Sequence, residues 1–106
     1  QQWDYYYNRF KKTNPPPIRM NPSEYYKRQA YATFFNDHVG TQTLGFWKDS
    51  NCMWSNDFPH ENSTWPRSRE VIARDLGHLP EDTRAKLVRG TVVDLYKLRV
   101  PEPVAV

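Results

Sequence analysis

The sequence has one cysteine and no apolar run long enough to cross a bilayer. Its single thiol, Cys52, cannot form a disulfide within the chain, which favours a reducing, cytoplasmic environment. A membrane-spanning helix needs roughly 20 consecutive apolar residues, and no stretch approaches that length. No charged segment followed by an apolar one begins the chain, and Gln1 in place of Met indicates a processed chain or part of a longer protein. We therefore expect a cytoplasmic protein with no membrane partner.

The sequence also lacks the motifs of two large enzyme classes. It contains four glycines, none of them in a glycine-rich phosphate-binding loop. Ser55, Ser63 and Ser68 have no nearby histidine and acid in a recognised nucleophile arrangement. Nucleotide chemistry and acyl-enzyme catalysis therefore have no support in this chain.

Apolar and aromatic residues are present in sufficient number for a small folded domain. The 106 residues are 38% apolar and 15% aromatic, with a net charge of +3 that is concentrated in residues 1–29. A basic, tyrosine-rich start suits a small binding module for nucleic acid or a protein partner, without catalysis, which is the alternative function. However, Trp3, Tyr6, Tyr7 and Phe10 have the spacing of one helix face, which predicts a buried stripe and no nucleic-acid partner.

Helices and strands are expected to alternate along the chain. A helix over residues 3–12 should end before the prolines 15–17, and a short helix should run from Asn21-Pro22 to about residue 28. Residues 30–35 and 52–54 have the composition of strands. Between these strands, Asn36 and Asp37 are suited to cap a helix. The apolar face of this helix comprises Val39, Thr43, Leu44 and Trp47, and the helix should end at Lys48 and Asp49.

Three helices should follow the polar loop 60–64. Proline favours the first helical turn, and glycine favours the position just past a helix end. The first helix buries Ile72, Leu76 and Leu79. The first helix is expected to run from Pro66 to Leu79 and the second from Pro80 to Gly90. The third is expected to end at Leu98, with Thr91 and Asp94 as a capping pair at its start. Strand, helix, strand, helix is the pattern of parallel βαβ units, although two strands do not complete such a fold.

The carboxylate of Asp57 is the first candidate for chemistry. It follows an apolar strand directly, and catalytic groups of α/β enzymes are found at the carboxyl ends of strands. Asp57 is suited to bind a divalent metal or to take a proton from metal-bound water, while the structural alternative is a helix cap or Asx turn. His60 in the following loop would support Asp57 or contact substrate rather than bind the metal. His38 and His78 have no partner at metal-ligand spacing.

Several segments together resemble the C-terminal part of the amidohydrolase-related family, which includes aminocarboxymuconate semialdehyde decarboxylase and related metal-dependent hydrolases and decarboxylases. The resemblance runs from Trp3 to Leu98, with the motifs in the order and spacing of the family. The segments that carry it are 21–26, Met53-Trp54-Ser55-Asn56-Asp57-Phe58-Pro59-His60, 64–68 and 79–96. The chain departs from the family at Ser55-Asn56, where Gly-Ser is common, and at Gly90-Thr91, where Gly-Asn is common.

The resemblance implies an α/β fold in which this chain is the C-terminal fragment of a TIM (β/α)8 barrel, with about two parallel strands and surrounding helices. Residues 1–29 would lead into the barrel, 30–60 would hold the two strands, and 61–100 the last helices. Asp57 matches the aspartate that closes the eighth strand of the family and faces its metal. The remaining ligands of the family are histidines upstream of Gln1, so a zinc ion would be held mainly by protein outside this chain.

The function expected from the sequence is therefore part of a metal-dependent hydrolase or non-oxidative decarboxylase. Its substrate would be a small carboxylated or aromatic compound. The 106 residues alone should be inactive, because a catalytic zinc site needs about three protein ligands. The sequence leaves the substrate, the metal and any homo-oligomer of the full-length enzyme open.

Overall fold

A computed structural model describes residues 1–46 and 49–101 of the chain, which divides into two units. The first unit, Gln1–Ala30, is a pair of helices, here called the N-terminal hairpin. The second, Tyr31–Val106, holds both strands and the remaining helices and is called the α/β unit. Among the described residues, no helix combines the length and apolar character that a membrane crossing requires.

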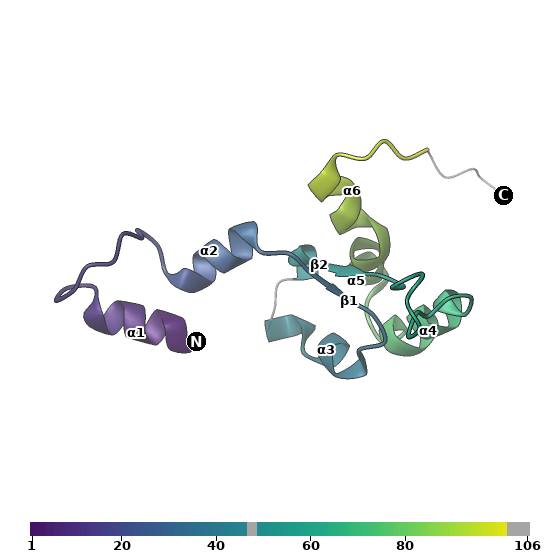
Figure 1. The fold of residues 1–106 in the computed structure, drawn as a ribbon, viewed down its shortest axis with the longest axis horizontal. Helices are drawn as coiled ribbons and strands as arrows, with labels where there is room; N and C mark the ends of the chain where they lie inside the picture. Colours follow the sequence, from purple (N-terminus) through teal and green to yellow (C-terminus); the bar gives the residue numbers. More distant parts are fainter. Residues whose placement is uncertain (47–48, 102–106) are drawn as a thin grey trace. The chain divides into compact units, whose positions relative to one another are not determined.

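The N-terminal hairpin consists of α1 (Gln2–Phe10) and α2 (Pro22–Gln29), joined by a proline-containing loop (Figure 1). Polar contacts hold the two helices together. Asp4 accepts a hydrogen bond from the Ser23 amide at 2.9 Å, and the Asn8 amide group donates to the Asn21 side chain at 3.0 Å. The predicted start of α2 is confirmed, and Asn21 forms a capping box with Glu24.

The predicted burial of the aromatic stripe on α1 is wrong. Trp3, Tyr6 and Phe10 are 69%, 54% and 47% exposed, and α1 has no buried residue. Two short helices with polar contacts between them cannot enclose a row of large rings, because each helix covers only one side of the other. The helix itself forms as predicted, so only the expected burial of its aromatic face is wrong.

The two strands of the α/β unit, β1 (Ala32–Phe34) and β2 (Cys52–Trp54), pair in parallel. Their register places Phe34 opposite Trp54, and the ladder continues with a 2.9 Å hydrogen bond from the Ser55 amide to the Phe34 carbonyl. β2 has the predicted limits, whereas β1 is shorter than the predicted strand. In the described part of the chain, each strand pairs only with the other, so both outer edges are unpaired.

The connection between the strands contains α3 (His38–Gln42) and the 3-10 turns Leu44–Phe46 and Asp49–Asn51. Asp37 caps α3 as predicted, accepting a 2.7 Å hydrogen bond from the Gly40 amide. The predicted longer helix is wrong, because the chain tightens into a 3-10 turn after Thr43, whose hydroxyl bonds the Gly40 carbonyl. Of the predicted face, Leu44 is buried and Val39 is exposed, while Trp47 and Lys48 lie outside the described residues.

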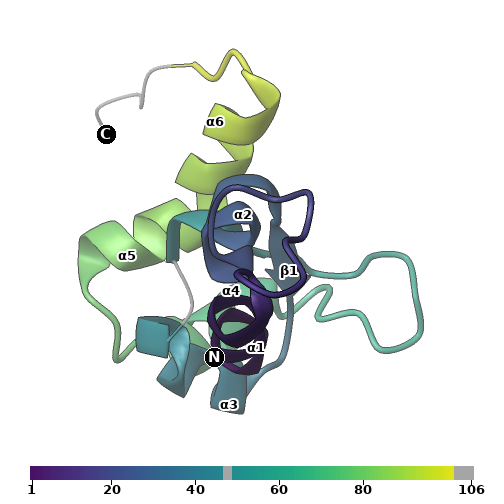
Figure 2. The same cartoon turned by 90° about the vertical axis from the view of Figure 1, so that its left-hand side faces the viewer.

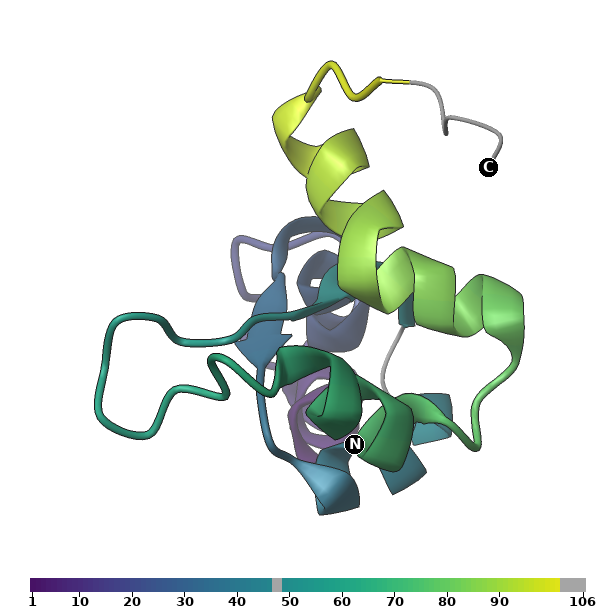
Figure 3. The ribbon, with the colours of Figure 1, turned by 90° about the vertical axis from the view of Figure 1, so that its right-hand side faces the viewer.

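The core of the α/β unit lies between the sheet and the helices that follow β2 (Figure 3). α4 (Ser68–Leu76) is shorter than the predicted helix, which was expected to reach Leu79. Leu76 is fully buried as predicted, and Ile72 and Leu79 are partly buried against the same cluster. These side chains pack with Leu44 and Leu87. Side chains on one face of the sheet border this cluster, namely Phe34, Cys52 and Trp54. Burial raises the pKa of the Cys52 thiol, which fits a packing role rather than a nucleophile.

The helices at the C-terminal end form one continuous helical segment (Figure 3). α5 (Glu81–Ala85) leads through a π-helical turn (Lys86–Gly90) into α6 (Thr91–Tyr96). The predictions that Gly90 ends a helix and that Thr91 caps the next are therefore wrong. Gly90 has φ −59°, and Thr91 is buried inside the helix. Burial of Leu87 and Thr91 on one face, four residues apart, outweighs the weak helix preference of glycine.

Replacing Gly90 by alanine tests this correction. The added methyl group would meet Ala85 and Lys86 at 3.7–3.8 Å, which is ordinary van der Waals contact. We expect Gly90→Ala to raise the free energy of unfolding by about 0.5–1 kcal/mol, because glycine has more backbone freedom to lose on folding. The measurement is urea unfolding followed by circular dichroism.

Gly77→Ala is the matched control, because its methyl group would collide with the Ala73 carbonyl oxygen and should destabilise the protein. A loss of stability in Gly90→Ala would contradict the continuous helix. A glycine that ended the helix with positive φ would give that result.

Candidate active-site loop

The loop after β2 is closed at its base by hydrogen bonds to one carbonyl. The Ser63 hydroxyl donates to the Asn56 carbonyl at 2.7 Å, and the Thr64 amide donates to the same oxygen at 3.0 Å. Residues 57–63 therefore project beyond the sheet as a closed loop, which is visible in two views (Figure 2, Figure 3). This closure fixes the two ends of the loop that carries Asp57.

Asp57 and His60 contact each other within a single turn of this loop. The His60 amide donates to the Asp57 carbonyl at 2.9 Å, and His60 Nδ1 lies 2.9 Å from Asp57 Oδ1. The Asp57 side chain is 27% exposed and that of His60 is 72% exposed. With Nδ1 protonated, His60 donates a hydrogen bond that orients the carboxylate. The supporting role of His60 in a reaction stays a prediction.

The two structural roles considered for Asp57 belong to other residues. The Asx turn is formed by Asn56, whose side chain accepts a 3.2 Å hydrogen bond from the Phe58 amide. The next helix, α4, begins only at Ser68. Asp57 instead has φ 56°, a left-handed conformation that costs energy for a residue with a side chain. A strained carboxylate at a strand end is a site candidate.

The ends of both strands lie at the same edge of the sheet, because the strands are parallel and in register. Asn36 is two residues past β1, and Asn56 is two residues past β2. Asn36 also has a positive φ of 47°, and its side chain accepts a hydrogen bond from Arg74 on α4. Arg74 thus connects the helix after the Asp57 loop with the end of the neighbouring strand.

Asp75 completes this network and was not recognised in the sequence. Its carboxylate accepts hydrogen bonds from Arg74 Nε at 2.6 Å and from Arg74 Nη2 at 3.0 Å, while its side chain is only 1% exposed. The Arg74 guanidinium lowers the pKa of Asp75 against the opposing effect of burial. The signal in the sequence was an acid directly beside the core residue Leu76, with an arginine before it.

The described residues alone do not form a metal site. Nowhere in ranges 1–46 and 49–101 do three histidine, cysteine, aspartate or glutamate side chains gather closely enough to hold an ion. Asp57 offers a carboxylate and His60 one imidazole, and these two groups already contact each other. His78 lies beside Gln42, with 3.3 Å between their side-chain nitrogens. The fit to zinc is therefore limited to one carboxylate ligand, and further ligands would have to come from outside these residues.

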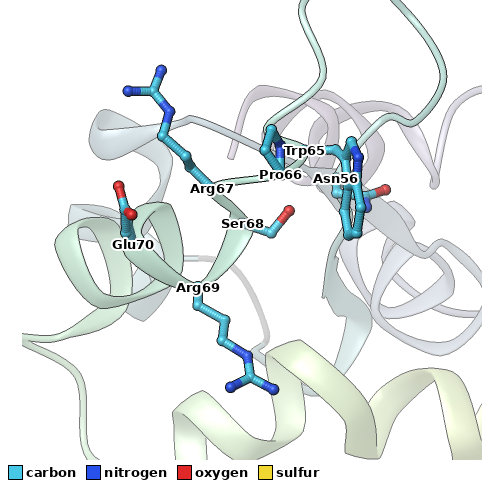
Figure 4. Close-up of a pocket in the computed structure, with 7 residues that line it drawn as sticks. All are labelled: Asn56, Trp65, Pro66, Arg67, Ser68, Arg69 and Glu70. Carbon is cyan, nitrogen blue, oxygen red and sulfur yellow. The ribbon is translucent and has the colours of Figure 1, made fainter.

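Two open hollows flank Trp65 beside this loop. One, of about 390 Å³, lies between Trp65, Asn56 and the start of α4 (Figure 4). The other, of about 340 Å³, is bordered by Asn56, Phe58 and Trp65. The rings of Phe58 and Trp65 meet edge to face, with their centroids 6.1 Å apart. Asp57 lines neither hollow.

The basic residues near the first hollow do not converge on it. Ser68 points toward Trp65 and Asn56 in Figure 4, whereas the guanidinium groups of Arg67 and Arg69 extend away from them. A solvated helix face accounts for both arginines better than a carboxylate-binding pair.

Comparison with known proteins shows a likeness in fold. No family model and no curated protein sequence matches this chain. Its fold is similar to the crystal structure of 5-carboxyvanillate decarboxylase LigW from Sphingomonas paucimobilis, with a TM-score of 0.72 and 20% sequence identity. The chain has the fold of part of that decarboxylase. The match covers 92% of this chain but only 29% of the decarboxylase chain, so two parallel strands with their helices correspond to a segment of a larger fold.

Proposed function

We propose that this chain is part of a metal-dependent decarboxylase or hydrolase of the amidohydrolase-related type. Its substrate would be a small carboxylated or aromatic compound. The observation that carries the proposal is the position of Asp57, three residues past a parallel strand and oriented by His60. It is supported by the likeness in fold to a segment of a decarboxylase.

The small sheet supports the idea that the two strands belong to a larger barrel. Parallel sheets are normally covered on both faces and extended on both sides, because unpaired edges expose backbone donors and acceptors. Here the sheet of β1 and β2 has two unpaired edges among the described residues. Further strands of a barrel would pair with these edges and place more side chains beside Asp57.

In the proposed site, Asp57 would be one ligand of a divalent cation, most simply zinc, or would accept a proton beside it. When bound, such a cation polarises a substrate oxygen and lowers the pKa of bound water. His60 engages Oδ1 of Asp57, and in the described part of the chain Oδ2 has no hydrogen-bond partner, so Oδ2 is the atom available for either role. His60 would hold the carboxylate in one orientation, which preserves its charge for the reaction.

The isolated 106-residue chain tests the proposal directly. We expect it to show no turnover of an aromatic carboxylate such as 5-carboxyvanillate, and to retain no stoichiometric zinc after dialysis, because the described residues offer too few ligands. Absorbance assays and elemental analysis provide the two measurements. Activity of the isolated chain, or one tightly held zinc ion per chain, would show that the site is complete without further protein and would contradict the fragment proposal.

A further inference from the structure

The aromatic side chains of α1 form a surface that the proposed catalytic function does not use. Four rings and one guanidinium group make up this surface, here called the α1 face, namely Trp3, Tyr5, Tyr6, Arg9 and Phe10. Tyr6 and Phe10 lie nearly parallel with centroids 6.2 Å apart, and Tyr5 meets Tyr6 edge to face at 5.3 Å. All four aromatic side chains are exposed. Large rings gathered on one helix face are typical of a surface that another protein segment covers.

Arg9 determines the chemistry that such a segment needs. Its guanidinium group lies over Tyr5 and Phe10, at 6.0 and 5.5 Å from the ring centroids, and donates to the Tyr5 hydroxyl. Covering this face would desolvate the cation, which is costly unless an acceptor faces it. The two acids of the hairpin are already engaged, Asp4 with the Ser23 amide and Glu24 with the Asn21 amide. The acceptor must therefore come from the covering segment.

Charge also disfavours a second copy of the same face. The N-terminal hairpin has six cationic side chains and two acids, whereas the rest of the chain is close to neutral. Two α1 faces pressed together would bring two such hairpins and two Arg9 side chains into contact without a compensating acid. An apolar surface that carries a carboxylate opposite Arg9 fits this face better.

The structural comparison indicates where this surface comes from. The α/β unit makes up less than three quarters of the chain, so a match over 92% of the chain has to include most of the N-terminal hairpin. The hairpin is thus part of the similarity to a chain of which 71% lies outside the match. We propose that the α1 face docks onto protein that corresponds to this remaining part of the decarboxylase-like fold, through an apolar patch with a carboxylate facing Arg9. This inference rests on the proposed function and names the part of the enzyme that would cover the α1 face.

Hydroxyl-radical footprinting of the native protein, isolated from its source, tests the inference. Trp, Tyr and Phe side chains react according to their solvent exposure, and mass spectrometry resolves each residue. We expect Trp3, Tyr6 and Phe10 to react at least about fivefold more slowly in the native protein than in the isolated 106-residue chain, with the urea-unfolded chain as the reference for intrinsic reactivity. Equal reactivity in the native protein and the isolated chain would overturn the inference.

Other occupants give different results in the same assay. Protection in the isolated chain at low concentration would mean that the chain covers its own α1 face, and protection that rises with concentration would identify a second copy. Protection of the isolated chain by a 20-nucleotide oligo(dT) or by phosphatidylserine vesicles would assign the face to nucleic acid or to a lipid surface. Each of these results overturns the proposal that the α1 face docks onto the remaining part of the decarboxylase-like fold.

A single substitution adds an independent measurement. Tyr6→Ser should lower the thermal midpoint of the native protein by about 4 °C or more and leave that of the isolated chain nearly unchanged, because the ring is covered only in the native protein. Equal shifts in both proteins would overturn the inference. Elemental analysis of the same native sample tests the proposed function separately, since protection without bound metal would preserve docking and refute the metal site.

Discussion

Replacing Asp57 by asparagine in the complete enzyme is expected to lower kcat/KM for an aromatic carboxylate by about 10²- to 10⁴-fold. Asparagine keeps the shape of the side chain and still accepts the hydrogen bond from His60 at Oδ1. It lacks the negative charge that binds a cation and the basicity that accepts a proton. Steady-state kinetics and the metal content of the purified variant together measure the effect.

The control for this experiment is Asp94→Asn, which changes an exposed acid on α6. It should leave both kcat/KM and metal content unchanged. His60→Asn should have a smaller effect than Asp57→Asn, because in the proposed site His60 only orients the carboxylate. Full activity in Asp57→Asn would refute the assignment of Asp57 to the reaction.

The second large effect is expected at the ion pair between the exposed Arg74 and the buried Asp75. Replacing Arg74 by methionine keeps the length of the side chain but leaves the Asp75 carboxylate, 1% exposed, without its cation. We expect the thermal midpoint at pH 7 to fall by at least about 4 °C. Asp75→Asn should lower the thermal midpoint by less, because Arg74 is largely exposed and can be hydrated. Circular dichroism melts of the two variants and of their double mutant make the comparison.

The pH dependence of this pair has a defined sign. Arg74 lowers the pKa of Asp75, so ionised Asp75 stabilises the fold above its unfolded pKa of about 3.9, and this stability is lost as the pH falls through the lower folded value. Without Arg74, burial raises the pKa of Asp75, so lowering the pH protonates the acid and relieves its cost. The difference in thermal midpoint between the unsubstituted protein and Arg74→Met should therefore shrink as the pH is lowered from 7 to 4. A stability deficit that grows over this range would contradict the pairing of Arg74 with the buried carboxylate of Asp75.

Local patterns were sufficient where neighbouring residues decide the structure. The limits of β2 follow from an apolar run that ends in a polar turn, and the start of α2 follows from Asn21 and Pro22. Asp37 could be recognised as a helix cap because its partner, the Gly40 amide, is only three residues away. Hydrogen bonds of this kind depend on neighbouring residues and need no distant partner.

The candidate site was predicted in part. The position of Asp57 at a strand end and its contact with His60 follow from short spacing along the chain. The bond from Arg74 to Asn36 joins residues 38 positions apart, and no local pattern indicates it. Asp57 lines neither of the two hollows beside Trp65, and its left-handed backbone was not specified by any sequence pattern.

The sequence by itself determined the order of helices and strands and which carboxylate stands at a strand end, because capping groups, prolines and apolar periodicity act over a few residues. The tertiary structure decided what each face contacts. It left the rings of α1 exposed, carried a helix through Gly90, and buried Asp75 against the core. Burial is a property of the whole packing arrangement, so the same apolar spacing predicts an interior stripe whether or not a covering surface is present.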